Sequence, residues 1–327
     1  MSWNHILQID PGSAEPLRQR IDTLFEQQRE TWPLLRDGEA ALGGLQKKTL
    51  TSGSESVVVQ VNPARRRSTQ AKTDAKSVAA RACFLCPENM PAEERGIAFE
   101  DLVVMPNPFP VLPLHTTIAG REHLPQRIGG RVEMMLRLAE AIGPDLTVFY
   151  NGPRCGASAP DHFHFQAASA DAIPILAQLP RRDGEHSIVA HSSFGRHMLV
   201  FGGAGLADVG ADIERAIGTL RQIDSANAEP VDEPMLNLIA HFQEGRFAAV
   251  LFPRAAHRPA CFFKTGGEQL TISPAVLEMC GILVTTEPDH FARVNAEVAH
   301  GIFEEVSISR RQFEELANKV AIPRTLP

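Results

Sequence analysis

Residues 151–168, NGPRCGASAPDHFHFQAA, decide how this chain is interpreted. The centre of this stretch is HFHFQ, residues 162–166. Alternate side chains of a β-strand point to the same side of the sheet. We therefore expect a strand over 163–168, with the two histidines and the glutamine on one face and the two phenylalanines in the core behind it. Buried aromatic rings would make this strand a rigid platform for a catalytic group.

A half-buried strand whose histidines and glutamine are merely solvated is the alternative interpretation of the same pattern. The preceding loop, rich in Gly, Ser, Ala and Pro, favours the catalytic interpretation. Glycine lets a phosphate approach the backbone closely, and successive backbone N–H groups can bind an anion. The segment therefore predicts a site for phosphoryl chemistry at the start of the strand.

Composition narrows the class of protein. The 327 residues are 43% hydrophobic and 22% charged, which is typical of a globular chain, and the formal net charge is -7. A negative chain has no general attraction to nucleic acid or to an anionic membrane, so we expect neither as a partner. The N-terminus lacks the pattern of a secretory signal, and no apolar run is long enough to cross a bilayer. Five cysteines, two of them in a Cys-x-x-Cys, favour a reducing compartment. We therefore predict a cytoplasmic protein.

Hydrophobic periodicity predicts helices and short strands in irregular alternation. The expected helices are 14–29, 130–141, 207–224, 274–280, 288–304 and a last helix that opens with a Ser309–Gln312 capping box. The expected strands are 56–61, 101–105, 146–150, 163–168, 187–192, 197–202, 247–252 and 269–272. Residues 36–54 are polar and rich in glycine, which indicates a loop or a poorly packed connection. The fold class expected is α+β.

Cys83, Cys86, His115 and His162 form a candidate metal set. Two thiolates and two imidazoles suit tetrahedral Zn²⁺, which we predict as a structural cofactor. The alternatives are cysteines buried as small apolar residues, with His115 at a strand end, and a redox Cys-x-x-Cys. No thioredoxin-like strand and helix follow the cysteines.

Two segments supply candidate phosphate ligands. Residues 62–72, NPARRRSTQAK, are locally basic, and residues 252–263, FPRAAHRPACFF, place Arg and His side chains in a loop after a buried strand. Guanidinium groups match the geometry of phosphate. A solvated basic face and an ordinary surface loop are the respective alternatives.

The chain resembles the transferase branch of the histidine-triad superfamily. Cys-x-x-Cys, NPFP, YNGPRCGASAPDH and His-x-His-x-Gln occur in the order found in galactose-1-phosphate uridylyltransferase, diadenosine tetraphosphate phosphorylase and the GDP-hexose phosphorylases. The resemblance implies that His164 attacks the α-phosphorus of a nucleotide, that Gln166 holds the phosphoryl oxygens, and that Ser158 assists them. It also implies that His162 is a metal ligand. The hydrolases of the superfamily carry a third His where this chain has Gln166, so transfer is favoured over hydrolysis.

The resemblance implies two histidine-triad-like halves built from antiparallel sheets with packed helices. We expect an N-terminal helical extension over 1–55, the catalytic half over 56–180, and a second half without the catalytic motif over 181–327. The residues expected to bind substrate are Asn62, Arg65, Arg67, Lys72, Asn107, Asn151, Gly156, Arg254, His257 and Arg258.

The expected reaction transfers a nucleoside monophosphate from an NDP-sugar or a dinucleoside polyphosphate. A nucleotidyl-His164 intermediate would pass the group to phosphate or a sugar 1-phosphate. The resemblance also implies that the protein forms a homodimer. A non-catalytic nucleotide-binding zinc scaffold and a nucleotide hydrolase are the alternative functions.

Overall fold

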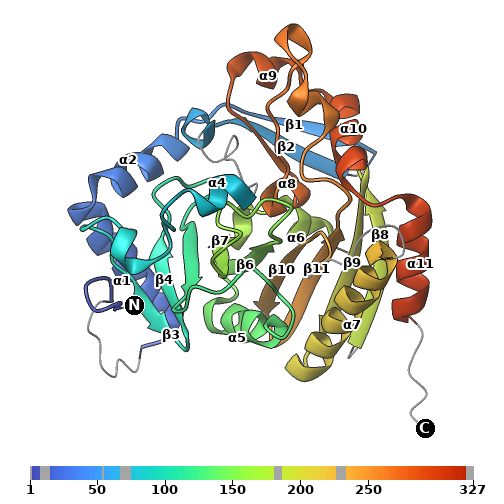
Figure 1. Cartoon of the computed structure of the whole chain (residues 1–327). Helices are drawn as coiled ribbons and strands as arrows, with labels where there is room; N and C mark the ends of the chain where they lie inside the picture. Colours follow the sequence, from blue (N-terminus) through green and yellow to red (C-terminus); the bar gives the residue numbers. More distant parts are fainter. Residues whose placement is uncertain are drawn as a thin grey trace.

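The structure, a computed structural model, describes residues 2–7, 15–53, 55–66, 75–179, 186–225 and 233–321. Its centre is one sheet with the strand order β3-β4-β5-β7-β6-β10-β11-β9-β8 (Figure 1). These strands are β3 (Ile97–Phe99), β4 (Leu102–Pro106), β5 (Thr116–Gly120), β6 (Leu146–Asn151), β7 (His164–Ser169), β8 (His186–Ser193), β9 (Arg196–Gly203), β10 (Leu236–Gln243) and β11 (Arg246–Pro253). All the pairings in this sheet are antiparallel. The predicted α+β class is confirmed.

Strands from both predicted halves meet in this sheet where β6 pairs with β10. Asn151 lies opposite Asn237 at one end of this pairing. The continuous sheet means that the loop after β6, which leads to the His-x-His motif, lies beside strands of the second half. The division into an extension and two halves stays a prediction.

One face of the sheet is covered by helices that bury a large apolar core. These are α1 (Leu17–Thr31), α5 (Val132–Ile142), α7 (Leu206–Ser225) and α11 (Arg310–Ala321). Phe163 and Phe165 point into this core, where their ring centroids lie 4.9 Å apart. The predicted burial of the two phenylalanines is confirmed, and it leaves the opposite face of β7 for polar side chains.

The opposite face carries a second, smaller sheet and three short helices from residues 276–306 (Figure 1). Strands β1 (Lys47–Ser52) and β2 (Glu55–Val61) pair antiparallel, and β12 (Ile282–Thr285) adds in parallel to β2. Helices α8 (Val276–Met279), α9 (Pro288–Arg293) and α10 (Ala296–Val306) pack here. The short helices α2 (Pro33–Leu42), α4 (Ala75–Ala79) and α6 (Pro174–Gln178) complete the set of α-helices in the described residues.

Three expectations about local structure are wrong. Residues 36–42 form the end of α2 and residues 47–52 form strand β1, where a loop or a poorly packed connection was expected. Residues 269–272 are irregular and pair in neither sheet. The helix expected over 288–304 is divided into α9 and α10 at residues 294–295. The predicted capping box is confirmed, since the Ser309 backbone N–H donates to Gln312 Oε1 at 3.1 Å.

No helix in the described part of the chain combines the length and the apolar character needed to cross a membrane.

Candidate active site and metal centre

The His164 imidazole is held in one orientation by its own strand. Nδ1 lies 2.9 Å from the carbonyl oxygen of His162, which can only accept a hydrogen bond, so Nδ1 carries the proton. Nε2 of the neutral ring then keeps its lone pair, and no hydrogen-bond partner of this atom is found among the described residues. The side chain is buried, and this burial lowers the pKa of His164 to about 4. The ring therefore presents Nε2 as an unprotonated nitrogen.

The backbone of His164 is clamped by Gln126, a residue that the sequence analysis did not identify. Gln126 Oε1 accepts from the His164 backbone N–H at 2.7 Å, and its Nε2 donates to the His164 carbonyl at 2.9 Å. The same Nε2 group donates to the Asn151 carbonyl at 3.0 Å. One buried amide thus joins the start of β7 to the end of β6. Nothing in the sequence around Gln126 signals this role.

Gln166 lies two residues further along β7, on the same face as His164. Its cross-strand neighbours are Thr117 on β5 and Phe149 on β6. Gln166 Oε1 lies 3.1 Å from Nε2 of His115, and the amide nitrogen of Gln166 has no partner among the described residues. The predicted pairing of His164 and Gln166 on one face agrees with the strand geometry.

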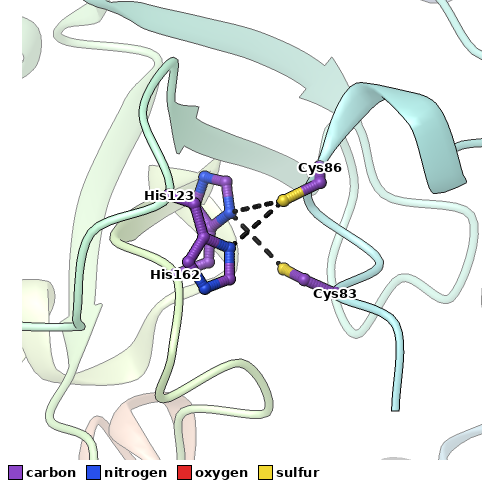
Figure 2. A group of neighbouring side chains, drawn as sticks. All are labelled: Cys83, Cys86, His123 and His162. Atoms are coloured by element: carbon purple, nitrogen blue, oxygen red, sulfur yellow. Dashed lines mark hydrogen bonds between the residues drawn. The ribbon is translucent and has the colours of Figure 1, made fainter. Parts of the chain in front are cut away.

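A Cys₂His₂ group lies beside this strand, and its fourth member is His123, which is exposed while the other three members are buried (Figure 2). The candidate ligand atoms of Cys83, Cys86, His123 and His162 all lie within 4.8 Å of one another. Cys83 Sγ is 3.4 Å from His162 Nδ1, and Cys86 Sγ is 3.2 Å from His123 Nδ1. Burial raises the pKa of both thiols in the absence of a metal, that of Cys86 to about 12.

The prediction that His115 completes the metal group is wrong in this structure. Both of its ring nitrogens have other partners, since Nδ1 accepts from the Val111 backbone N–H at 3.1 Å and Nε2 contacts Gln166. His115 precedes β5, and His123 follows it. In the antiparallel pairing with β7, Ala119 lies opposite His164, so the end of β5 faces the start of β7, where His162 lies. His123 is therefore the histidine near the cysteines.

The donor set fits a tetrahedral metal ion. His162 Nε2 donates to the Gly120 carbonyl at 2.8 Å, which leaves Nδ1 with its lone pair toward the sulfurs. His123 Nε2 lies 3.9 Å from a carboxylate oxygen of Asp161. Hydrogen-bonding and carboxylate partners of this kind orient metal-binding histidines. Two thiols and two oriented imidazoles match the ligand preference of Zn²⁺.

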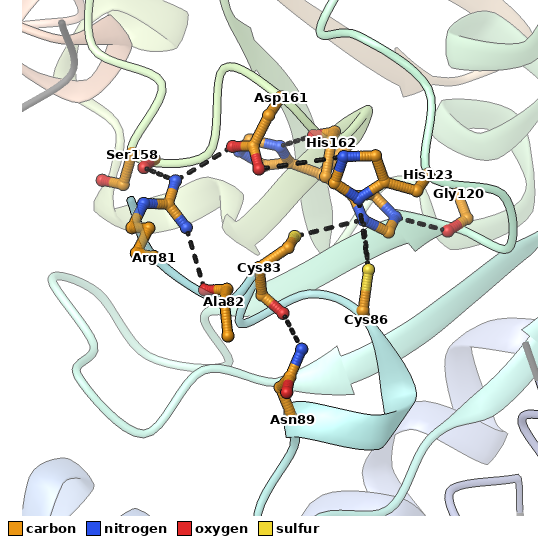
Figure 3. A network of polar contacts seen from close by, with 11 residues as sticks. Arg81, Ala82, Cys83, Cys86, Asn89, Gly120, His123, Ser158, Asp161 and His162 are labelled. Carbon is orange, nitrogen blue, oxygen red and sulfur yellow. Dashed lines mark hydrogen bonds and ion pairs between the residues drawn. The ribbon is translucent and has the colours of Figure 1, made fainter. Parts of the chain in front are cut away.

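Arg81, two residues before Cys83, joins the Cys₂His₂ group to the loop before β7 (Figure 3). Its guanidinium donates to Asp161 Oδ1 at 2.9 Å and to the Ser158 carbonyl at 3.1 Å. The Ser158 backbone is thus fixed, while its hydroxyl has no hydrogen-bond partner among the described residues. Gly156, in the same loop, has φ 114°, and a Cβ there would lie 2.5 Å from the Cβ of Ala275. The loop therefore packs closely against the second half.

Several residues expected to bind substrate support the protein itself. Asn62 donates to the Pro110 carbonyl at 3.2 Å, and Arg65 donates to the Phe109 carbonyl at 2.9 Å. Asn107 accepts from the Phe109 N–H at 2.9 Å and donates to Thr117 Oγ1 at 3.2 Å. These contacts shape residues 107–111 beside the site. Arg67 and Lys72 lie outside the described residues.

Arg254 has a structural role where a phosphate contact was expected. It is 1% exposed, and its guanidinium donates to Asn237 Oδ1 and to the carbonyls of Val306 and Pro274. Asn237 in turn donates to Asn151 Oδ1 at 2.9 Å, so Asn151 is also held within the protein. Because the N–H groups of this guanidinium donate to internal acceptors, they are not available to a ligand.

His257 and Arg258 lie together beside Ser273. Arg258 Nε donates to Ser273 Oγ at 3.0 Å, and its guanidinium lies 4.2 Å from the centroid of the Phe262 ring. Burial, together with the positive charges of Arg258 and Arg254, lowers the pKa of His257 to about 4. Their predicted contact with an acceptor phosphate stays a prediction.

Fold and site together define an α+β protein whose fold is shared with solved nucleotide phosphorylases, and two family models match successive parts of the chain. Residues 24–169 match the family model described as "Domain of unknown function (DUF4922)", and residues 173–322 match the model "GDPGP1-like, C-terminal domain". No curated protein sequence matches the chain.

Solved structures of yeast Ap4A phosphorylase Apa2 share the fold. One is 16% identical, with a TM-score of 0.58, and the match covers 90% of this chain and 94% of that chain. The complex with Ap4A is 13% identical, with a TM-score of 0.54 and coverage of 87% of this chain and 97% of that chain. The complex with AMP gives 13% identity, a TM-score of 0.52 and coverage of 86% and 96%.

Proposed function

We propose that this chain is a nucleotidyltransferase of the phosphorylase kind. It would take a nucleoside monophosphate from an NDP-sugar or a dinucleoside polyphosphate and pass it, through nucleotidyl-His164, to phosphate or a sugar 1-phosphate. The observation that carries the proposal is the bond from His164 Nδ1 to the His162 carbonyl, because it leaves Nε2 as the free nucleophilic atom. The shared fold with yeast Ap4A phosphorylase supports the same class of reaction.

The proposed reaction has two displacements at the α-phosphorus. In the first, Nε2 of His164 forms a P–N bond as the P–O bond to the departing sugar phosphate or nucleotide breaks. The ring becomes positive, and the His162 carbonyl stabilises the Nδ1 proton that it keeps. In the second displacement an acceptor oxygen forms the new P–O bond, the P–N bond breaks, and neutral His164 is regenerated. Splitting one displacement into two lowers each barrier.

Positioned donors would do most of the remaining work, as in phosphoryl transfer generally. The amide nitrogen of Gln166 and the hydroxyl of Ser158 are the side-chain donors proposed for the phosphoryl oxygens. Gly156 lets the loop backbone come close to the phosphates. Arg65, Arg67 and Lys72 stay candidates for neutralising the charge of the nucleotide.

Zn²⁺ is proposed as a structural ion held by Cys83, Cys86, His123 and His162. When bound it would supply strong cross-links between three segments of chain and would not meet the substrate. Because His162 lies only two residues before His164, the ion would also fix the His162 carbonyl, which accepts from the ring of the nucleophile. The cytoplasmic location and the homodimer stay predictions.

Product analysis tests this function. The purified protein would be incubated with Ap4A and a panel of NDP-sugars, with and without inorganic phosphate, and the products separated by anion-exchange chromatography. We expect a nucleoside diphosphate as product only when phosphate is present, and no turnover by His164→Ala. Nucleoside monophosphate formed at the same rate without phosphate would indicate a hydrolase. Tight nucleotide binding without any product would indicate a binding scaffold.

A further inference from the structure

His115 has a hydrogen-bond pattern that fixes its tautomer. The Val111 backbone N–H donates to Nδ1 at 3.1 Å, and a backbone N–H can only donate. Nδ1 is therefore unprotonated, and the proton of the neutral ring lies on Nε2. That Nε2–H donates to Gln166 Oε1 at 3.1 Å. Ring tautomer and amide orientation agree with each other, because only an oxygen can accept this proton.

The ring keeps this polarity because it is shielded from water. His115 is 1% exposed. Burial, followed by the positive charge of Arg65, lowers the pKa of His115 to about 3. A neutral imidazole has one donor and one acceptor. Because Nδ1 accepts from the Val111 N–H, Nε2 can only donate, and its acceptor is Gln166.

The segment that anchors His115 is itself held by side chains from β2 and the turn after it. Three successive carbonyls accept hydrogen bonds there: Phe109 from Arg65, Pro110 from Asn62, and Val111 from Gln60. Leu114, next to His115, has φ 52°, a conformation that a non-glycine residue adopts only when its surroundings impose it. The position of the imidazole is thus determined by the chain on both sides.

We propose that His115 is the positioning residue that orients the Gln166 amide, so that its NH₂ group faces the phosphoryl oxygens of the nucleotidyl group on His164. This inference rests on the proposed function. A carboxamide that rotated by half a turn would place its oxygen against an anionic oxygen, which repels it. The Nε2–H bond from His115 removes that orientation before substrate binds, so the donor is preorganised.

Two substitutions of nearly equal size separate this role from general packing. His115→Gln places an amide N–H about where Nε2 lies and can still donate to Gln166. His115→Asn keeps an acceptor near Nδ1 for the Val111 N–H but is too short to reach Gln166. Both variants keep a polar side chain in the cavity, and thermal unfolding would confirm that both fold.

The measurement is the single-turnover rate of nucleotidylation. The protein is mixed with Ap4A or an NDP-sugar, and intact-protein mass spectrometry monitors the formation of the adduct with time. We expect His115→Asn to slow nucleotidylation by about 100-fold, the effect of misplacing a catalytic group, and His115→Gln to restore most of the rate. In a Gln166→Ala background, His115→Asn should change the rate by less than about threefold, because the two residues act as one unit. Equal losses in both His115 variants, or the same loss in the Gln166→Ala background, would overturn the proposal.

A second readout does not depend on activity. Long-range ¹H–¹⁵N NMR of the imidazoles, with His115 assigned by its absence in His115→Gln, reports which nitrogen carries the proton. The Nε2–H tautomer is expected, and an Nδ1–H tautomer would overturn the inference. If wild-type protein formed no adduct with any donor, the proposed function would fail, while the tautomer would still decide whether His115 holds Gln166.

Discussion

The carbonyl oxygen of His162 lies 2.9 Å from Nδ1 of His164, while the ring of His162 lies in the Cys₂His₂ group. One residue therefore contacts both groups, because its imidazole lies in the Cys₂His₂ group and its backbone carbonyl accepts from the His164 ring.

We expect the metal to depend on His123 and not on His115. Wild-type protein should contain one Zn²⁺ per chain, His123→Ala should lose most of it, and His115→Gln should retain it, because His115 contacts Val111 and Gln166. Metal analysis of the purified variants measures this, and unfolding temperatures should fall with the metal content. A His115 variant without zinc beside a zinc-loaded His123→Ala would contradict the assignment.

Arg254→Met should destabilise the protein without a direct effect on ligand contacts. The substitution leaves Asn237 Oδ1 and the buried Pro274 carbonyl without this donor, at a cost of about 3 kcal/mol or more. Urea denaturation measures the change in the free energy of unfolding. Arg310→Met is the control, because that side chain is 85% exposed and its loss should cost about 0.5 kcal/mol or less. Similar values for the two variants would show that Arg254 is not the internal donor described.

Glu233 makes stability depend on pH. Burial raises the pKa of Glu233 from 4.5 to about 7, although Tyr150 and the Ile128 N–H donate to the carboxylate. Between these two values the folded state holds a proton that the unfolded chain has released. The free energy of unfolding therefore falls as the pH rises through this window, by roughly 3 kcal/mol in all.

Glu233→Gln removes this titration. Urea denaturation from pH 4.5 to 8 measures the free energy of unfolding of both proteins. The value for the variant should rise relative to that of wild type as the pH increases. A difference between the two proteins that stayed constant over this range would show that Glu233 titrates normally.

Gly156→Ala should damage the loop before the catalytic strand. A Cβ there would lie 2.5 Å from Ala275 Cβ, and φ is 114°. Gly245→Ala is the matched control, since Gly245 also has positive φ, 73°, but open space around it. The control should lose only about 1 kcal/mol of stability, and Gly156→Ala should lose more together with nucleotide turnover. Equal effects would mean that close packing on Ala275 is unimportant.

Strand β7 was predictable because its signal is local. HFHFQ contains the alternation that places His164 and Gln166 on one face and two phenylalanines in the core. The capping box of α11 is local in the same way. The Cys-x-x-Cys spacing also placed Cys83 and Cys86 together in the candidate metal set, and both thiols lie in the Cys₂His₂ group.

The features of the fold and the site that were not predicted depend on contacts between segments far apart in the sequence. Either His115 or His123 could be chosen from the sequence, and only the antiparallel register of β5 and β7 decides between them. In that register His162, two residues before β7, lies near the end of β5 and therefore near His123. Strand β1 was missed because its partner β2, and not its own polar sequence, makes it a strand. The burial of Arg254 depends on carbonyls from residues 20 and 52 positions away, which no local pattern reveals.

The central claim is that His164 carries the nucleotidyl group. Intact-protein mass spectrometry after incubation with Ap4A or an NDP-sugar, without acceptor and without acid, tests it most directly. We predict that wild type and His300→Ala, a variant of a half-exposed histidine, each gain the mass of one nucleoside monophosphate, and that His164→Ala gains none. The account is contradicted if His164→Ala gains the same mass as wild type.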